Sequence, residues 1–291
     1  MTILNIIQQA AQRIGIPSPS SAVGSTNNSA IMLLAKAQEA GRKIRDAHEW
    51  PELTKEWLIT LVDAQANYAF PGDMNWQIFE THWDRNNHWP LIGPLSAQEW
   101  QVKKSGISTT VPRKMWRVKG YQDRQFYLHQ TPGTGDAGSI LVFEYVTETW
   151  CRPRTWVTST VYAAGSYTFY NGNIYTTTAG GTTGATPPTH TSGSFSDGGV
   201  TWTYTINSYQ AFLADTDEVI IDNELLIDGI VWRYKKERGF DYESDMEEAE
   251  KAIQDEISSL TGASIIRWGG GYAGPIGIGW WSIPDGDFPT S

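Results

Sequence analysis

One uncharged stretch divides the chain and constrains its fold more than any other feature. Between Thr155 and Ile206 the only charged residue is Asp197, although the 291-residue protein carries 22 Lys and Arg and 32 Asp and Glu. Gly-containing turn signals separate short runs rich in Thr and Tyr, and Asn171-Gly172 is the strongest hairpin signal among them. The stretch is therefore predicted to form a small all-β module of four or five short strands.

Two amphipathic helices are predicted before this stretch. Residues 2–15 place apolar side chains at helical spacing, and Gly15 ends the pattern. A second apolar stripe runs over residues 28–49. Pro51 ends that helix, because the residue before a proline avoids the helical backbone conformation.

A β-rich section follows the second helix. Its strongest strand pattern covers residues 139–150. A short helix is predicted from Leu95 to Lys104, with Ser96 and Glu99 as the two halves of a capping box. In the strand at 139–150, Leu141, Phe143 and Tyr145 share one face. The other short strands are expected at 58–62, at 68–70, around Trp76, Ile78 and Phe79, and around Trp89, Leu91 and Ile92.

Charge and helical pattern return together after Tyr209. Asp222 or Asn223 can cap a helix that Gly239 ends, and apolar residues cover much of its circumference. We therefore expect this helix to be buried on more than one side. A further helix is predicted from Asp241, with a narrow apolar seam and an acidic opposite face.

The last segment, residues 262–291, follows neither the helical nor the strand period. It is rich in Gly and contains Trp268, Trp280 and Trp281. Such a segment cannot fold alone, yet it is too apolar for an ordinary solvated linker. We expect it to dock in an extended form on another protein, and a frayed C-terminus is the alternative.

The bulk composition limits the classes of function. A net charge of −10 argues against broad, phosphate-driven nucleic-acid binding. A single cysteine, Cys151, excludes an internal disulfide and a multi-cysteine zinc site, and we expect it to be structural. No signal-peptide pattern and no membrane-spanning apolar run are present, so synthesis in a cytoplasm is expected. A local basic patch remains at Arg113, Lys114, Arg117 and Lys119.

Four motifs carry a resemblance to a known protein family. They are AGRKIRDAHEWPELTKEW, NYAFPGDM, ILVFEYVTETW and the long FLADTDEVIIDNELLIDGIVWRYKKERGFDYESDMEEAEKAI. Together they resemble the head-to-tail adaptors of short-tailed bacteriophages, which are also called connectors or tail tubular protein A. The likeness covers residues 2–151 and 208–260.

The resemblance implies a fold and a place in the virion. The fold is α+β: a helical-bundle adaptor core with a β-rich middle section over residues 1–151 and 208–261, an inserted all-β module at 152–207, and an extended C-terminal tail at 262–291. Family members form a ring, usually of twelve copies, between the portal protein and the tail nozzle at one capsid vertex. Genomic DNA passes through the lumen during packaging and ejection without specific binding. No catalytic residue, metal, cofactor or membrane contact is expected.

Three sets of candidate contact residues follow from these expectations. The portal-contact candidates in the tail are Trp268, Tyr272, Ile276, Trp280 and Trp281. The ring-contact candidates on the two late helices are Leu226, Ile230, Tyr234, Met246 and Ile253. The glycan-stacking candidates in the module are Tyr167, Tyr170, Tyr175 and Trp202, to which Tyr162 and Tyr204 can be added.

The inserted module leaves a second function open. It resembles the carbohydrate-binding-like β modules that decorate phage tail and capsid proteins, in which exposed aromatic rings stack on sugars. Strand alternation predicts instead that half of its aromatic residues fill the module's own core. A role of the module as an outer decoration, or in contact with a neighbouring fibre, is therefore favoured. A tail protein with a host-glycan-binding module is one alternative function, and a tail-associated peptidoglycan hydrolase is another.

Two groups of polar residues contain the side-chain types of a metal site or of a glycoside-cleaving site. His82, Asp84 and His88 have the ligand types of a metal site, but their spacing fits no helical pair. A polar turn between aromatic strands, with a histidine at a subunit contact, is the favoured interpretation. The carboxylate pairs Glu80–Asp84 and Glu144–Glu148 could serve as acid and base for glycoside cleavage, but charged outer strand faces are ordinary, so no catalysis is expected.

Overall fold

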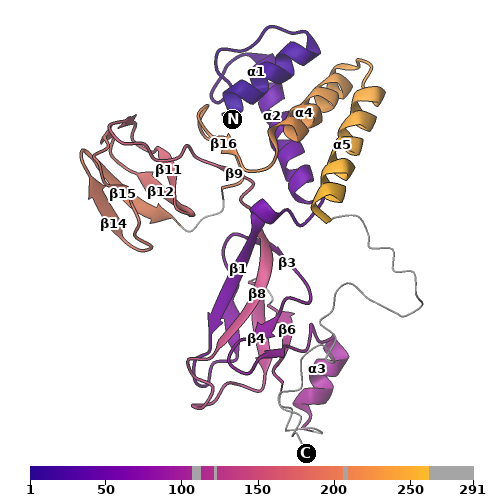
Figure 1. Cartoon of the computed structure of the whole chain (residues 1–291), viewed down its shortest axis with the longest axis vertical. Helices are drawn as coiled ribbons and strands as arrows, with labels where there is room; N and C mark the ends of the chain where they lie inside the picture. The colour runs from indigo at the N-terminus through magenta and orange to yellow at the C-terminus, as the bar shows by residue number, and fades with distance from the viewer. Residues whose placement is uncertain (107–112, 121–122, 206–208, 262–291) are drawn as a thin grey trace, which may run out of the picture. The chain divides into compact units, whose positions relative to one another are not determined.

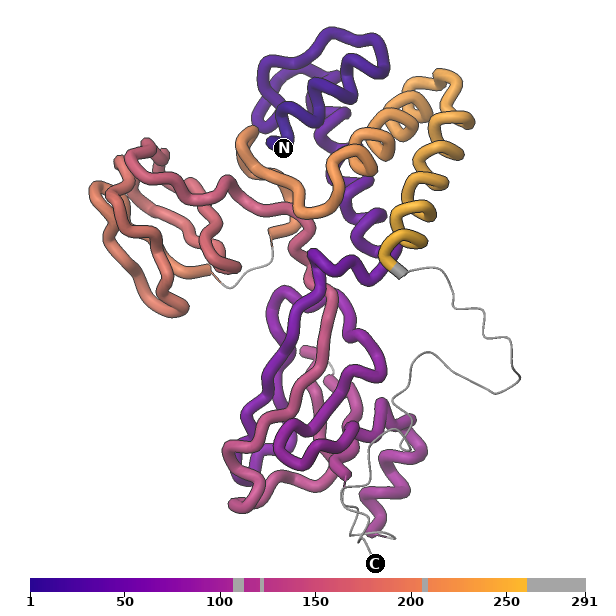
Figure 2. Tube along the Cα trace, in the orientation of Figure 1, coloured from indigo at the N-terminus to yellow at the C-terminus, as the bar shows by residue number. Residues whose placement is uncertain are grey.

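The computed structural model describes residues 1–106, 113–120, 123–205 and 209–261 (Figures 1 and 2). The chain divides into two units, Met1–Ile253 and Gln254–Ser291, and the described part of the second is the end of the last helix. The described residues combine α-helices with several small antiparallel sheets, in agreement with the predicted mixture of helix and strand.

The elements follow the chain in this order. The helices are α1 (Ile3–Ile14), α2 (Asn28–Arg45), α3 (Ala97–Lys104), α4 (Asn223–Arg238) and α5 (Glu243–Thr261), and a 3-10 turn, η1, covers Pro51–Leu53. The first nine strands are β1 (Thr54–Thr60), β2 (Asn67–Ala69), β3 (Met74–Gln77), β4 (Trp83–Asp84), β5 (Trp89–Pro90), β6 (Met115–Lys119), β7 (Gln125–His129), β8 (Ile140–Thr147) and β9 (Cys151–Arg152). The others are β10 (Val161–Tyr162), β11 (Tyr167–Tyr170), β12 (Asn173–Thr177), β13 (Gly181–Thr182), β14 (Ser194–Asp197), β15 (Val200–Thr205) and β16 (Glu218–Val219).

Helices α1, α2 and α4 pack against one another, although α4 lies far from the other two in the sequence (Figure 1). Local cap chemistry sets the limits of α4. The carboxylate of Asp222 accepts hydrogen bonds from two backbone N–H groups of the first turn, and Gly239 ends the helix at a φ of 72°. Both ends were predicted from the sequence.

Helix α2 ends at Arg45, before the predicted end at residue 49. The indole Nε1 of Trp50 donates a hydrogen bond of 2.7 Å to the carbonyl oxygen of Ile44. Since that carbonyl belongs to the last helical turn, Trp50 satisfies a group that further helix would otherwise use. The Trp50 indole and the backbone N–H of Ala47 thus both satisfy this carbonyl at the helix end, and the steric effect of Pro51 disfavours a longer helix.

Gly41 lets α2 approach Trp150, which follows β8 and is fully buried. A Cβ atom at Gly41 would lie 2.1 Å from Cζ3 and 2.5 Å from Cη2 of the Trp150 ring. The ring cannot easily retreat, because it packs edge-on against Phe212 with centroids 5.1 Å apart. The contact joins two of the sequence motifs described above.

Gly41→Ala is therefore expected to destabilise the protein, although alanine favours helix over glycine. Overpacking against the Trp150 ring outweighs the gain in helix propensity, for a net loss of about 2 kcal/mol in the free energy of unfolding. Denaturant unfolding measures the loss. Gly72→Ala is the matched control, because a Cβ at Gly72 meets no atom within 4 Å, and equal stability losses in the two variants would contradict the expectation.

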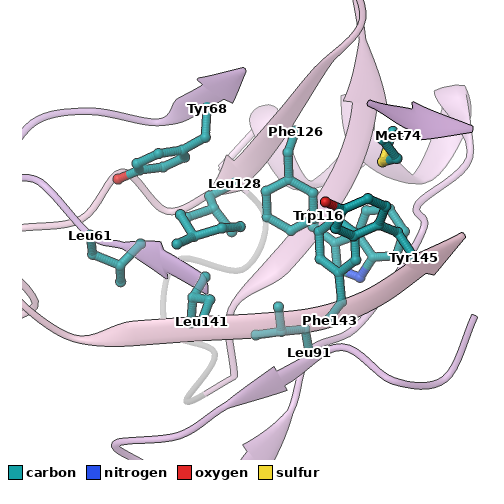
Figure 3. Close-up of a cluster of buried hydrophobic side chains, with 11 residues drawn as sticks. Leu61, Tyr68, Met74, Leu91, Trp116, Phe126, Leu128, Leu141, Phe143 and Tyr145 are labelled. Atoms are coloured by element: carbon teal, nitrogen blue, oxygen red, sulfur yellow. The ribbon is translucent and has the colours of Figure 1, made fainter. Parts of the chain in front are cut away.

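Two antiparallel sheets contribute the residues of a large aromatic cluster. One has the order β1-β8-β4-β5, with β3 also paired to β8, and the other has the order β2-β7-β6. Strand β1 begins at Thr54 rather than at residue 58, because it pairs with β8 along its whole length, from Thr54 opposite Val146 to Thr60 opposite Ile140. The cluster contains Leu141, Phe143 and Tyr145 as predicted, and Figure 3 shows Trp116, Phe126 and Phe143 together on one side of it.

The described residues of the uncharged stretch form six short strands, β10 to β15, where the sequence predicts four or five. Strands β11-β12-β15-β14 pair in this order, and β10 pairs with β13. Asn171 and Gly172 join β11 to β12 with φ angles of 46° and 83°, which suit a tight hairpin turn. The predicted Asn-Gly hairpin is thus confirmed.

Two short strands that flank the uncharged stretch pair with each other. β9 pairs with β16 in the register Cys151 with Val219 and Arg152 with Glu218. Next to this pair, Asp217 is 2% exposed, and its carboxylate accepts a hydrogen bond of 2.7 Å from the Tyr209 hydroxyl. Burial, and then the nearby carboxylate, raise the pKa of the Tyr209 hydroxyl, so it remains a neutral donor.

Candidate functional site

Three of the five predicted ring-contact residues point into the chain's own interior. Leu226 and Ile230 on α4 are fully buried, and Tyr234 is 2% exposed. Helix α4 packs on both α1 and α2, which is why its apolar residues extend around so much of its circumference. The fold uses these three side chains within one chain, and this corrects their assignment to a contact between copies.

Helix α5 keeps the two faces that the sequence predicts. Met246 and Ile253 are half-buried along its seam, and Ala249 between them is 3% exposed. Glu243 and Glu247 are exposed. The predicted portal-contact residues, Trp268, Tyr272, Ile276, Trp280 and Trp281, lie outside the described residues.

Half of the aromatic residues proposed to stack on glycans belong to the module's core. Tyr175 and Trp202 are fully buried, and the Tyr175 hydroxyl donates to the carbonyl of His190 at 3.1 Å. Tyr162 is also buried and meets Trp202 edge-on. The assignment of Tyr175 and Trp202 to an exposed sugar platform is therefore wrong. Tyr167, Tyr170 and Tyr204 are half-buried.

The three residues with metal-ligand chemistry serve different structural purposes. His82 is 3% exposed and stacks between Trp116 and Phe143, with ring centroids 4.1 Å and 4.5 Å away. The carboxylate of Asp84 instead accepts hydrogen bonds from the backbone N–H groups of Asn86 and Asn87 and from the Asn87 amide. His88 is exposed, and the polar-turn interpretation fits this geometry. Within the described residues, no group of three or more His, Cys, Asp or Glu side chains is placed to hold a metal ion.

Candidate nucleophiles and acids near the module also have structural partners. Cys151 is fully buried, its sulfur faces the carbonyl oxygen of Tyr209 at 3.6 Å, and burial raises the pKa of its thiol. A buried neutral thiol is a poor nucleophile. Glu148 binds the Gln210 amide. Glu144, in contrast, is exposed and lies opposite another acid, Glu56, on the neighbouring strand.

Cationic residues gather where α3 lies beside β7. The ammonium group of Lys119 lies 4.6 Å from the ring centroid of Trp100, and that of Lys104 lies 5.9 Å from the same ring. Trp100 is only 1% exposed, so it forms a fixed platform. We call the group of Lys103, Lys104, Arg117, Lys119 and His129 the basic surface.

The basic surface differs from the patch that the sequence indicates. Lys114, which was assigned to that patch, is 9% exposed and forms an ion pair of 2.9 Å with Asp136. Lys103 and Lys104 were missed, because they join Lys119 only through the fold, by way of Trp100. No local sequence signal links α3 to β6 in this manner.

No helix in the described ranges has the length and apolar character that crossing a bilayer requires.

Comparison with known proteins places the chain in a family. A search among curated proteins found no match. The family model described as "SU10 adaptor protein" matches residues 1–272. The chain therefore belongs to the SU10 adaptor protein family, which comprises structural adaptor proteins of bacteriophages.

Proposed function

We propose that this adaptor forms a ring, of twelve copies by analogy with the head-to-tail adaptors it resembles, between the portal protein and the tail nozzle. The observation that carries the proposal is the family match over residues 1–272. A ring requires two unlike faces on each subunit that meet around an axis. Genomic DNA passes through the lumen of this ring without being bound specifically.

The charge of the chain supports passage rather than binding of DNA. Each copy carries a net charge of −10, and a ring multiplies that charge around its axis. Phosphate groups are repelled by an acidic wall, so the duplex is not held in transit. The acidic residues of α5 add to this effect.

Each part of the chain has a role in this proposal. Residues 1–151 and 208–261 form the ring-building core, in which Met246 and Ile253 remain ring-contact candidates. Residues 152–207 form an outer decoration that touches a neighbouring tail component. Residues 262–291 dock on the portal through the aromatic side chains named above, because apolar anchors and main-chain hydrogen bonds offset the entropy of ordering an extended segment.

The test is assembly of the purified full chain with the portal protein of the same phage. Electron microscopy and size-exclusion chromatography with light scattering are expected to show adaptor copies as a ring on the portal. A chain that stays monomeric and ignores the portal would contradict the proposal.

A deletion separates the role of the tail from that of the core. Removing residues 262–291 is expected to abolish portal docking, while the melting temperature of the remaining chain stays unchanged. The control is a full-length variant with Trp268, Trp280 and Trp281 replaced by Ala, which keeps the tail's length and is expected to dock weakly. Docking that persists in the deletion variant would show that the tail is not the portal contact.

A further inference from the structure

The basic surface is unusual in a chain with a strong acidic excess. Residues 101–130 contain seven of the 22 Lys and Arg and only one of the 32 Asp and Glu. Within the described ranges, Lys103, Lys104, Arg117 and Lys119 form no ion pair. Positive charge is therefore concentrated here. Aromatic rings contact Lys104 and Lys119, but no carboxylate among the described residues forms an ion pair with them.

The fold holds these charges close together despite their repulsion. Lys119 lies between the rings of Trp100 and Tyr127, at 4.6 Å and 5.6 Å from their centroids. Burial, and then the charges of Arg117 and Lys104, lower the pKa of Lys119. Burial, followed by Lys104 and Lys103, likewise lowers the pKa of His129. An anionic partner would relieve this repulsion on docking.

A surface of opposite charge is present on the same chain. Glu243, Glu247 and Glu250 follow the spacing i, i+4, i+7 and are exposed on α5. Asp245, in contrast, already pairs with Lys235 at 2.6 Å. Among the residues that the structure describes, Glu243 and Glu247 have no cationic partner, so α5 keeps negative charge available for another molecule.

We propose that the basic surface of one copy binds the acidic face of α5 on a second copy. The inference rests on the proposed ring and names one of its contacts. The two surfaces are unlike, as a head-to-tail contact between neighbours requires, and their charges are complementary. Duplex DNA would also fit a basic surface, but an adaptor whose lumen conducts DNA gains nothing from a patch that holds phosphate.

A charge-swap experiment tests the contact on the full chain assembled with portal. K104E/K119E and, separately, E243K/E247K are each expected to raise the concentration for half-maximal ring assembly about tenfold. The variant that combines all four substitutions is expected to recover most of the wild-type assembly, since each charge again meets its opposite. Assembly of the combined variant also shows that these four substitutions are compatible with folding of the chain.

Charge reversal elsewhere provides the control. R42E/K43E changes the net charge by the same amount as K104E/K119E, at exposed positions on α2, and assembly is expected to change less than about twofold. If the wild type assembles normally but the combined variant does not recover assembly, the proposed contact is wrong. The proposed function is unaffected by that result. Equal losses in R42E/K43E and K104E/K119E overturn it as well.

Two further outcomes also decide against the contact. Loss of duplex DNA binding in K104E/K119E, with assembly unchanged, identifies the basic surface as a nucleic-acid site. A wild-type chain that never assembles on the portal removes the proposed function and this inference together.

Discussion

Lowering the pH from 6.5 to 4 is expected to remove about 3 kcal/mol from the free energy of unfolding through one residue, His82. Burial lowers the pKa of His82 from 6.5 to about 4. Between these two values the unfolded chain binds a proton at this position and the folded chain does not. The contribution is therefore fully present above pH 6.5 and is lost as the pH falls towards 4.

The surroundings of His82 explain why protonation is unfavourable. Its ring lies between Trp116 and Phe143 and meets one polar side chain, Gln77, whose amide oxygen is 2.9 Å from Nε2. A charged imidazolium would lose its hydration without gaining an anionic partner.

His82→Phe is the matched control for this pH dependence. Phenylalanine keeps a flat ring in the stack but cannot titrate, and other acid-sensitive groups remain the same in both proteins. Denaturant unfolding at several pH values is expected to give a stability difference between wild type and variant that changes by about 3 kcal/mol over this range. Parallel pH profiles for the two proteins would show that His82 does not titrate as its burial implies.

Replacing Asp217 by Ala is expected to destabilise the protein by about 3 kcal/mol. One carboxylate oxygen of Asp217 accepts hydrogen bonds from the Tyr209 hydroxyl at 2.7 Å and from the backbone N–H groups of Leu213 and Ala214 at 2.7 Å and 3.0 Å. The substitution leaves three donors without their acceptor at the place where the chain returns from the module. Thermal or denaturant unfolding measures the effect.

Two variants separate this network from a general effect of losing an acid. Asp215→Ala removes a half-buried carboxylate from the same loop, where it accepts hydrogen bonds from the N–H groups of Ala22 and Val23, and is expected to cost about 1 kcal/mol. Tyr209→Phe removes a single donor and is also expected to cost about 1 kcal/mol. If Asp217→Ala were no more destabilising than Asp215→Ala, the hydrogen-bond network would not be the source of stability.

The sequence predicts features that depend on neighbouring residues. The caps of α4 at Asp222 and Gly239 follow from local chemistry, as does the capping box of Ser96 and Glu99 on α3. The Asn171-Gly172 hairpin belongs to the same class, because its backbone angles are set by the two residues themselves.

Features that depend on distant partners were not predictable in this way. An apolar helix surface indicates that the helix is buried, but it does not indicate whether the covering side chains belong to the same chain. The sequence pattern therefore suggests a contact between copies for Leu226, Ile230 and Tyr234. In the structure these residues are buried, and α4 packs on α1 and α2 of its own chain. The early end of α2 depends on the Trp50 indole. The basic surface depends on Trp100, which brings α3 and β6 together.

The pairing of β9 with β16 has a consequence for how such a protein can diversify. Two short strands bonded to each other hold the exit and re-entry points of the chain at a fixed separation, with Arg152 and Glu218 also joined side chain to side chain at 3.0 Å. A segment inserted between these two strands begins and ends at the same paired residues, so it need not disturb the packing of α1, α2 and α4. The pairing therefore fixes where the chain leaves and rejoins the rest of the protein, so a change in the length or sequence of the intervening segment is expected to leave the stability of the α1–α2–α4 packing unchanged.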